Sequence, residues 1–215
     1  DCDGTDATSL AFAPLALRGQ DAFDLSGRGI TGVGDVDGDG LGDFLVGGPN
    51  QGDSSQGRGY LFFGRDFGGG ETLGLEEADV TFEGEGPGDI AANRVARAGD
   101  VDGDGRDDLL ISSPHHGGFG RAYLVLASQV TAGSFPLGQA AAIFDGGQAY
   151  DRFSWSLAGA GDVDGDGLDD LLFGSWSADG GGDLSGEASL FLASTVAAGG
   201  TFGAAQADAT FVGEA

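Results

Sequence analysis

One motif occurs three times in this chain, and the repetition constrains the fold more than any other feature of the sequence. The string Gly-Asp-Val-Asp-Gly-Asp-Gly has its first aspartate at Asp35, Asp100 and Asp162, at intervals of 65 and 62 residues. The same register continues upstream, where an aspartate stands 11 residues before each motif and an apolar residue stands seven residues earlier still, at Leu17, Phe82 and Phe144. A repeat of this length is a whole supersecondary unit, so the sequence predicts a tandem array.

Short apolar or alternating segments follow one another in each repeat, separated by turns rich in Gly and Asp. In the second repeat this pattern predicts four strands and no long helix, at residues 94–98, 108–112, 121–127 and 140–144. Residues 73–78 and 131–142 also fit a helical turn, and we interpret both segments as long loops that lead to a fourth strand. Four strands in about 60 residues, repeated in tandem, are typical of a β-propeller blade, and a solenoid is the alternative.

The repeat boundaries divide the chain into four parts. Residues 1–20 are the N-terminal end with the outer strand of a preceding blade, 21–84 the first blade, 85–146 the second blade, and 147–215 the third blade and the start of a further repeat. Residues 13–18 hold the register of a fourth strand, and residues 207–211 supply that strand to the third unit. Because closed propellers need about four to eight blades, we expect this chain to be part of a larger propeller, or a ring completed by associated chains.

Each motif places four carboxylates within nine residues, at positions 1, 3, 5 and 9 counted from its first aspartate. These are Asp35, Asp37, Asp39 and Asp43 in the first repeat, Asp100, Asp102, Asp104 and Asp108 in the second, and Asp162, Asp164, Asp166 and Asp170 in the third. Carboxylates this close repel one another by about 4 kcal/mol per pair at an effective dielectric constant near 20. A cation in each loop removes the repulsion. Hard oxygen ligands suit calcium, and we rank magnesium second because it demands tighter octahedral geometry.

Two other interpretations of these loops are an EF-hand and an ordinary turn. Glycine at position 6 permits a sharp turn that brings the carbonyl of position 7 toward the carboxylates, and these carbonyls belong to Leu41, Arg106 and Leu168. An EF-hand needs a glutamate at position 12, where this chain has Val46, Ile111 and Phe173. Asp and Gly also mark ordinary turns. Three copies with all four aspartates in register favour calcium, with about three ions and one per blade.

The motif together with the following Leu-Leu-x-x-x-Pro resembles the FG-GAP repeat, the blade of the seven-bladed propeller in integrin α-subunits and of many secreted bacterial proteins. The resemblance covers about residues 13–211 and implies an all-β fold of four-stranded antiparallel blades, with about three blades in this chain. It also implies that the calcium ligands are the positions named above, in the loop between the first and second strands. This chain departs from the family at the Phe-Gly pair, which is replaced by Ser26-Gly27, Ala91-Ala92 and Phe153-Ser154.

The composition excludes several classes of function. With nine Arg, no Lys and a net charge of −26, the chain lacks the cationic face that nucleic acids and anionic membranes require. No apolar run reaches the ~18 residues of a membrane span. No nucleophile elbow is present, and no lysine is available as a base, so we do not expect an enzyme. The scarcity of Lys and the load of Ala, Gly, Arg and Asp indicate a GC-rich bacterial genome.

These features together with the resemblance imply a calcium-binding, secreted or cell-surface propeller that serves as a protein or carbohydrate interaction and adhesion module. The alternative is a non-catalytic or substrate-binding propeller portion of a larger secreted enzyme. The expected partners are a protein or glycan ligand, together with remaining blades from the same polypeptide or from associated chains. The extracellular location follows from calcium loops with affinities of about 0.1 to 1 mM, which fill only where calcium is millimolar.

A few residues outside the repeat pattern also suggest processing, pairing or binding roles. The chain begins at Asp1 without a methionine, so we expect an upstream segment to have been removed. Cys2, the single cysteine, either pairs with a partner outside this chain or is a terminal thiol. The pair His115-His116 is a candidate transition-metal ligand or an exposed polar loop. Trp155 and Trp176 are either packed between blades or platforms on which sugars stack.

Overall fold

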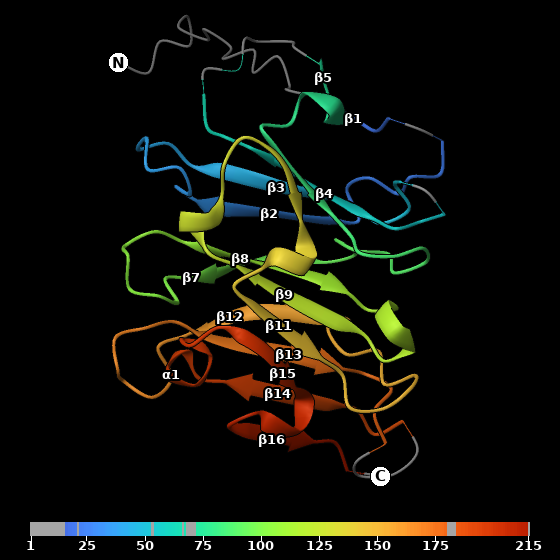
Figure 1. Ribbon diagram of the computed structural model, residues 1–215, viewed down its shortest axis with the longest axis vertical. Helices are drawn as coiled ribbons and strands as arrows, with labels where there is room; N and C mark the ends of the chain where they lie inside the picture. Colours follow the sequence, from blue (N-terminus) through green and yellow to red (C-terminus); the bar gives the residue numbers. More distant parts are fainter. Residues whose placement is uncertain are drawn as a thin grey trace, which may run out of the picture.

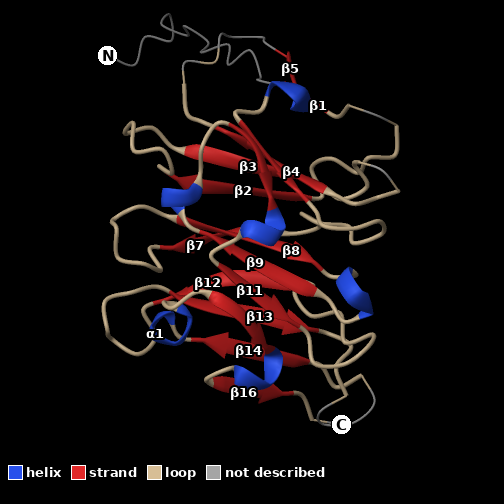
Figure 2. Cartoon of the chain, in the orientation of Figure 1, coloured by secondary structure: helices blue, strands red, loops and turns tan. Residues whose placement is uncertain are grey.

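The computed structural model of this protein describes residues 16–20, 22–52, 54–65, 67, 72–179 and 184–214. Figure 1 shows three β-sheets stacked on one another in the order of the sequence, from the blue first repeat to the red third repeat. In Figure 2 the sheets are joined by loops and by described helices of three or four residues each. None of these described helices has the length and apolar character needed to span a bilayer. Cys2 and residues 13–15 lie outside the described residues.

Each repeat forms one four-stranded antiparallel sheet, with the strands in sequence order across the sheet. The first blade consists of β2 (Gly29–Gly34), β3 (Asp43–Gly48), β4 (Arg58–Phe62) and β6 (Val80–Glu83). The second consists of β7 (Val95–Gly99), β8 (Asp108–Ser113), β9 (Arg121–Val125) and β11 (Ala142–Asp145), and the third of β12 (Ser156–Gly161), β13 (Asp170–Ser175), β14 (Glu187–Phe191) and β16 (Ala209–Val212). The prediction of an all-β chain built from propeller blades is therefore confirmed.

A further strand, contributed by the following repeat, lies against the outer strand of each of the first two blades. Strand β10 (Gly133–Pro136), from the second repeat, pairs in parallel with β6, and β15 (Gly200–Gly203), from the third repeat, pairs in parallel with β11. The same arrangement joins β5 (Thr72–Gly74) to β1 (Ala16–Arg18). An apolar residue of each added strand stands directly opposite the repeated apolar position of its partner, in the pairs Leu73 and Leu17, Phe135 and Phe82, and Phe202 and Phe144.

The prediction of long loops at residues 73–78 and 131–142 is therefore wrong. Each segment holds one of these short strands, followed by a 3₁₀ turn, η1 (Leu75–Glu77) or η4 (Leu137–Gln139). A strand of three or four residues is too short to show a hydrophobic period, and its pairing partner lies in a different repeat. The other short helices lie between strands in the same way: η2 (His116–Gly118), η3 (Ala127–Gln129), α1 (Ala193–Val196) and η5 (Ala204–Gln206).

The apolar core lies between the blades as well as within them. One cluster joins Leu45 and Phe82 of the first blade to Ile111 and Tyr123 of the second. A second cluster joins the second blade to the third through aromatic rings, since Phe144 lies 4.7 Å from Phe173 and 5.0 Å from Phe191 between ring centroids. These side chains are fully buried, so each blade depends on its neighbour for the burial of its apolar face.

The three pairs that stand where the family has Phe-Gly share one backbone conformation at their second residue. These second residues are Gly27, Ala92 and Ser154, and all three have a left-handed φ, of 86°, 57° and 63°. Glycine adopts this conformation without steric penalty, whereas for Ala and Ser it costs about 1–2 kcal/mol of conformational free energy. The three repeats therefore differ in the side chain at this position and share the left-handed backbone conformation.

The contact between the first two blades predicts one large effect of a small substitution. A Cβ atom on Gly47, in β3, would clash with the carbonyl oxygen of Ala92 and lie 3.1 Å from its carbonyl carbon. We expect Gly47→Ala to destabilise the fold by about 1–3 kcal/mol, because two backbone segments must move apart. Gly42→Ala is the matched control, since no described atom lies within 4 Å of the added Cβ. Equal stability of the two variants in urea unfolding would contradict this close approach.

Candidate metal loops

The three aspartate motifs form the loops between the first and second strands of the three blades. Residues 35–43 join β2 to β3, residues 100–108 join β7 to β8, and residues 162–170 join β12 to β13. The loops follow one another along one side of the stack, on the left in Figure 1. The repeat therefore places three equivalent acidic loops in a row.

The aspartate at position 1 organises each loop by accepting backbone hydrogen bonds. In the first loop, Asp35 Oδ1 accepts the N–H groups of Gly38 at 2.8 Å and Asp39 at 3.0 Å, and its Oδ2 accepts that of Gly40 at 2.8 Å. The glycines at positions 4 and 6 have left-handed φ angles in all three loops, at Gly38, Gly40, Gly103, Gly105, Gly165 and Gly167. Glycine is needed there because this conformation turns the chain back over the first carboxylate.

The aspartates at positions 3 and 5 each use one oxygen in a local turn. Asp37 Oδ1 accepts the N–H of Asp39 at 3.1 Å, and Asp39 Oδ1 accepts that of Leu41 at 2.8 Å. The second and third loops repeat both bonds, in the donor–acceptor pairs Asp104 and Asp102, Arg106 and Asp104, Asp166 and Asp164, and Leu168 and Asp166. The loops are thus folded around their carboxylates in one shared conformation.

The aspartate at position 9 is buried and has a structural role that the sequence pattern did not show. Asp108 is fully buried, and its two oxygens accept the N–H groups of Val101 at 2.9 Å and Ala127 at 2.8 Å. Asp43 binds Val36 and Gly64 in the same way, and Asp170 binds Val163 and Ala193. Position 9 therefore fastens each loop to the segment that follows the third strand of its blade.

Three of the four carboxylates of each loop come together. Mutual distances of at most 4.8 Å between one oxygen of each residue hold for Asp35, Asp37 and Asp39, for Asp100, Asp102 and Asp108, and for Asp162, Asp164 and Asp170. The remaining aspartates of the predicted set, Asp43, Asp104 and Asp166, lie in the same loops outside these groups of three. Leu41, Arg106 and Leu168 also lie in these loops, and the metal-binding role of their carbonyl groups stays a prediction.

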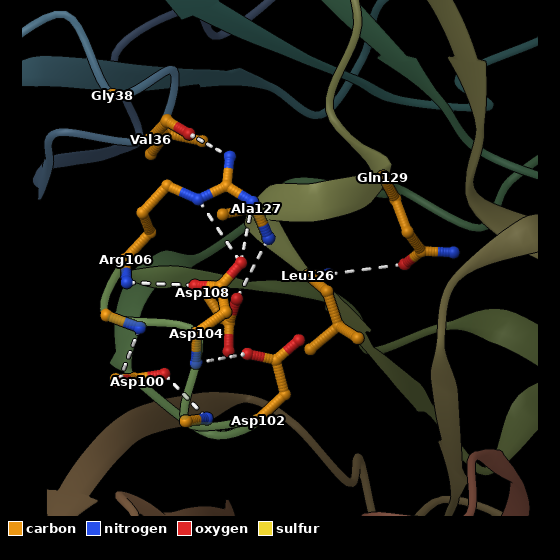
Figure 3. A network of polar contacts seen from close by, with 12 residues as sticks. Val36, Gly38, Asp100, Asp102, Asp104, Arg106, Asp108, Leu126, Ala127 and Gln129 are labelled. Carbon is orange, nitrogen blue, oxygen red and sulfur yellow. Dashed lines mark hydrogen bonds and ion pairs between the residues drawn. The ribbon is translucent and has the colours of Figure 1, made fainter.

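The second loop contains a cation of its own and contacts its neighbours. Figure 3 shows the guanidinium of Arg106 bound to Asp104, at 2.6 Å between Nη2 and Oδ2, and to the carbonyl oxygen of Val36 in the first loop, at 3.3 Å. On the other side, the N–H of Asp100 donates to Asp169 Oδ2 in the third loop at 2.8 Å. Position 8, occupied by Asp169, was missed by the sequence reasoning because its partner lies in a different repeat.

The electrostatics of these loops favour a bound cation. Burial raises the pKa of Asp108 to about 7; the N–H groups of Ala127 and Val101 oppose this shift, and the nearby charges of Asp102 and Asp104 add to it. Burial also raises the pKa of Asp43. A cation opposes both desolvation and repulsion, because it stabilises the ionised carboxylates. The donor set consists of carboxylate oxygens held close together on a preformed loop, and this fits a hard divalent ion.

Comparisons with known proteins agree with this architecture. The model of the family described as FG-GAP repeat matches residues 28–62 and 92–125. Integrin alpha-IIb from Homo sapiens is 31% identical over 177 residues, which cover 74% of this chain and 15% of the relative. Integrin alpha-PS2 from Drosophila melanogaster is 33% identical over 173 residues, covering 71% and 12%, and integrin alpha-4 from Xenopus laevis is 29% identical over 146 residues, covering 66% and 13%. The chain therefore spans only a small part of the length of these relatives.

Proposed function

Since this chain is an integrin-like FG-GAP repeat protein, we propose that it is a calcium-binding β-propeller module that binds other proteins or carbohydrates outside the cell. The observation that carries the proposal is the convergence of three carboxylates in each of three equivalent loops. The ligands would be the aspartates at positions 1, 3, 5 and 9 with the carbonyl oxygen of position 7. The role is one of binding rather than catalysis, with calcium holding the loops in one conformation.

The extracellular location rests on the chemistry of the loops. Extracellular calcium modules have dissociation constants of about 0.1–1 mM, which match calcium outside the cell. At the calcium concentration of a cytoplasm such loops would stay empty, and their carboxylates would repel one another. Submicromolar affinity at all three loops would contradict this location.

We expect calorimetric titration of the metal-stripped protein to give about three calcium sites. Asp102→Ala should leave two sites, because Asp102 contributes to one cluster only and is exposed. Glu76→Ala is the control, since it removes the same charge from an exposed residue in η1, outside the loops, and should leave three sites. A stoichiometry near zero for the unsubstituted protein would overturn the proposal.

We also propose that further blades cover the two ends of the stack. Ile30, in β2 of the first blade, is 69% exposed, whereas Val95 at the same position of the second blade is 8% exposed. At the other end Phe211 is 61% exposed, whereas its equivalent Phe144 is fully buried in a strand that pairs with the added strand β15. The proposal is supported by the internal repeats, where a neighbouring blade and its added strand cover the equivalent positions. These blades would come from the same polypeptide or from an associated chain.

A further inference from the structure

A cavity of about 310 Å³ lies at the opposite ends of the blade strands from the aspartate loops. Its lining comes from three connections: the turn between β6 and β7, the turn between β8 and β9, and the turn between β11 and β12. The lining residues are Gly88, Pro114, His115, Gly118, Tyr150 and Arg152. The second and third repeats therefore build this cavity together, and none of these lining residues belongs to the Gly-Asp-Val-Asp-Gly-Asp-Gly motif.

Basic side chains gather around Trp155, which contacts two of the lining residues, His115 and Arg152. Arg152 Nη1 donates a hydrogen bond to His115 Nε2 at 2.7 Å, and the Arg152 guanidinium lies 5.5 Å from the centre of the Trp155 ring. Arg28, from the first repeat, lies 6.0 Å from the same ring. His115 stacks on Trp155 with a centroid distance of 6.4 Å. Residues of three repeats thus bring two guanidinium groups to one indole.

These two cations lack carboxylate partners within the described part of the chain. No ion pair between described residues includes Arg28 or Arg152, and none of the described residues that line the cavity is acidic. Burial lowers the pKa of His115, and the charges of Arg152 and Arg28 lower it further, so a neutral ring accepts the hydrogen bond. In a chain with a net charge of −26, two arginines that lie near one indole and form no ion pair with a described residue mark a place for an anion from outside.

Exposed aromatic rings border the same place. Trp176 contacts Trp155 edge to face, with a centroid distance of 6.1 Å, and is itself 51% exposed. Tyr150, which lines the cavity, is 79% exposed. Large aromatic rings that are left exposed offer flat apolar surfaces next to polar groups, and the apolar face of a sugar ring packs on such a surface.

We propose that this cavity binds a carboxylated sugar, such as a uronate residue of an acidic polysaccharide. The carboxylate would be held by Arg152, whose planar guanidinium matches a carboxylate in a two-pronged hydrogen bond, with Arg28 adding positive charge. The sugar ring would pack on Trp176 or Tyr150. This inference rests on the proposed interaction function and names its ligand class, and it uses none of the aspartate loops.

An acidic peptide also carries a carboxylate, but it lacks the ring that the exposed aromatics fit. The two ligand classes separate experimentally by fluorescence, because, of the chain's two tryptophans, Trp155 contacts the lining residue His115 and Trp176 contacts Trp155. Trigalacturonate, neutral galactotriose and a tripeptide of glutamate are titrated at one constant calcium concentration. We expect trigalacturonate to change the fluorescence with at least tenfold higher affinity than the other two.

Substitutions then assign the two parts of the ligand. Arg152→Gln and Trp176→Ala should each weaken trigalacturonate binding by about tenfold or more, since each removes an interaction worth about 1.4 kcal/mol. Arg65→Gln is the matched control, because Arg65 is at the aspartate-loop end of its blade and forms an ion pair with Asp79. It should leave the affinity unchanged.

Three results would overturn the inference: no fluorescence change with any probe, equal affinity for the glutamate tripeptide, or unchanged binding in Arg152→Gln. Failure here is separable from failure of the proposed calcium function, since the calorimetric calcium titration is made on the same variants. We expect Arg152→Gln to keep about three calcium sites while it loses trigalacturonate.

Discussion

Removal of calcium is expected to lower the melting temperature of this protein by about 8–16 °C, since about 4 kcal/mol shifts a protein of this size by that amount. A site that binds only the folded state, with a dissociation constant tenfold below the ambient calcium concentration, contributes about 1.4 kcal/mol. Three independent sites contribute roughly 4 kcal/mol, a large share of the usual 5–15 kcal/mol of net stability. Chelation also restores repulsion among the clustered carboxylates.

Thermal melts with calcium, with chelator, and with chelator plus high salt separate these two contributions. Salt screens exposed charges, so high salt should recover the repulsive part of the loss and leave the binding part unrecovered. The effect of chelation should therefore be largest at low ionic strength. Identical melting temperatures with calcium and with chelator would mean that the aspartate loops are ordinary turns.

The second large effect is expected at the buried aspartate of position 9. Asp108→Ala should destabilise the fold by about 2–6 kcal/mol even without calcium, because the N–H groups of Val101 and Ala127 lose their acceptors in a buried place. Asp102→Ala is the contrasting variant in the same loop, since Asp102 is exposed and accepts one N–H in a local turn. It should lower stability mainly when calcium is present.

Urea unfolding of both variants, in chelator and in calcium, makes the comparison. Asp108→Asn serves as an intermediate case, because its amide keeps one oxygen acceptor. If Asp108→Ala and Asp102→Ala lose the same stability in chelator, the fastening role of position 9 is wrong, and position 9 acts only through the metal.

The blades and the loops were predictable from the sequence because both follow from residues close together in one repeat. The spacing of Asp35, Asp37 and Asp39 predicts their convergence, and apolar segments bounded by Gly and Asp predict β7, β8, β9 and β11. The sequence predicts position 9 as a loop residue that binds the metal, and this role stays a prediction; its burial and its two hydrogen bonds depend on where the third strand ends, as at Ala127. The spacing of residues within the motif carries no information about where the third strand ends.

Contacts between repeats were beyond the sequence pattern for a physical reason. Residues 133–136 are too short to show a strand period, and their partner β6 belongs to the preceding repeat. The basic cavity is a further case, since Arg28, His115 and Trp155 come from three repeats and share no motif. One hypothesis from the sequence did point toward it, namely that Trp155 and Trp176 are platforms on which sugars stack.

The parallel strand that each repeat lends to its predecessor has a consequence for the order of synthesis. When a ribosome has completed β6, the outer edge of the first blade is still unpaired. The strand that pairs with it, β10, has not yet been synthesised, so Phe82 has no Phe135 opposite it. In the same way, Phe144 lacks its partner until Phe202 of the third repeat has been synthesised. Each blade therefore gains its fifth strand only after most of the next blade has been synthesised, so the formation of successive blades overlaps in time. A chain interrupted between blades would leave an open sheet edge, a template for pairing with another chain.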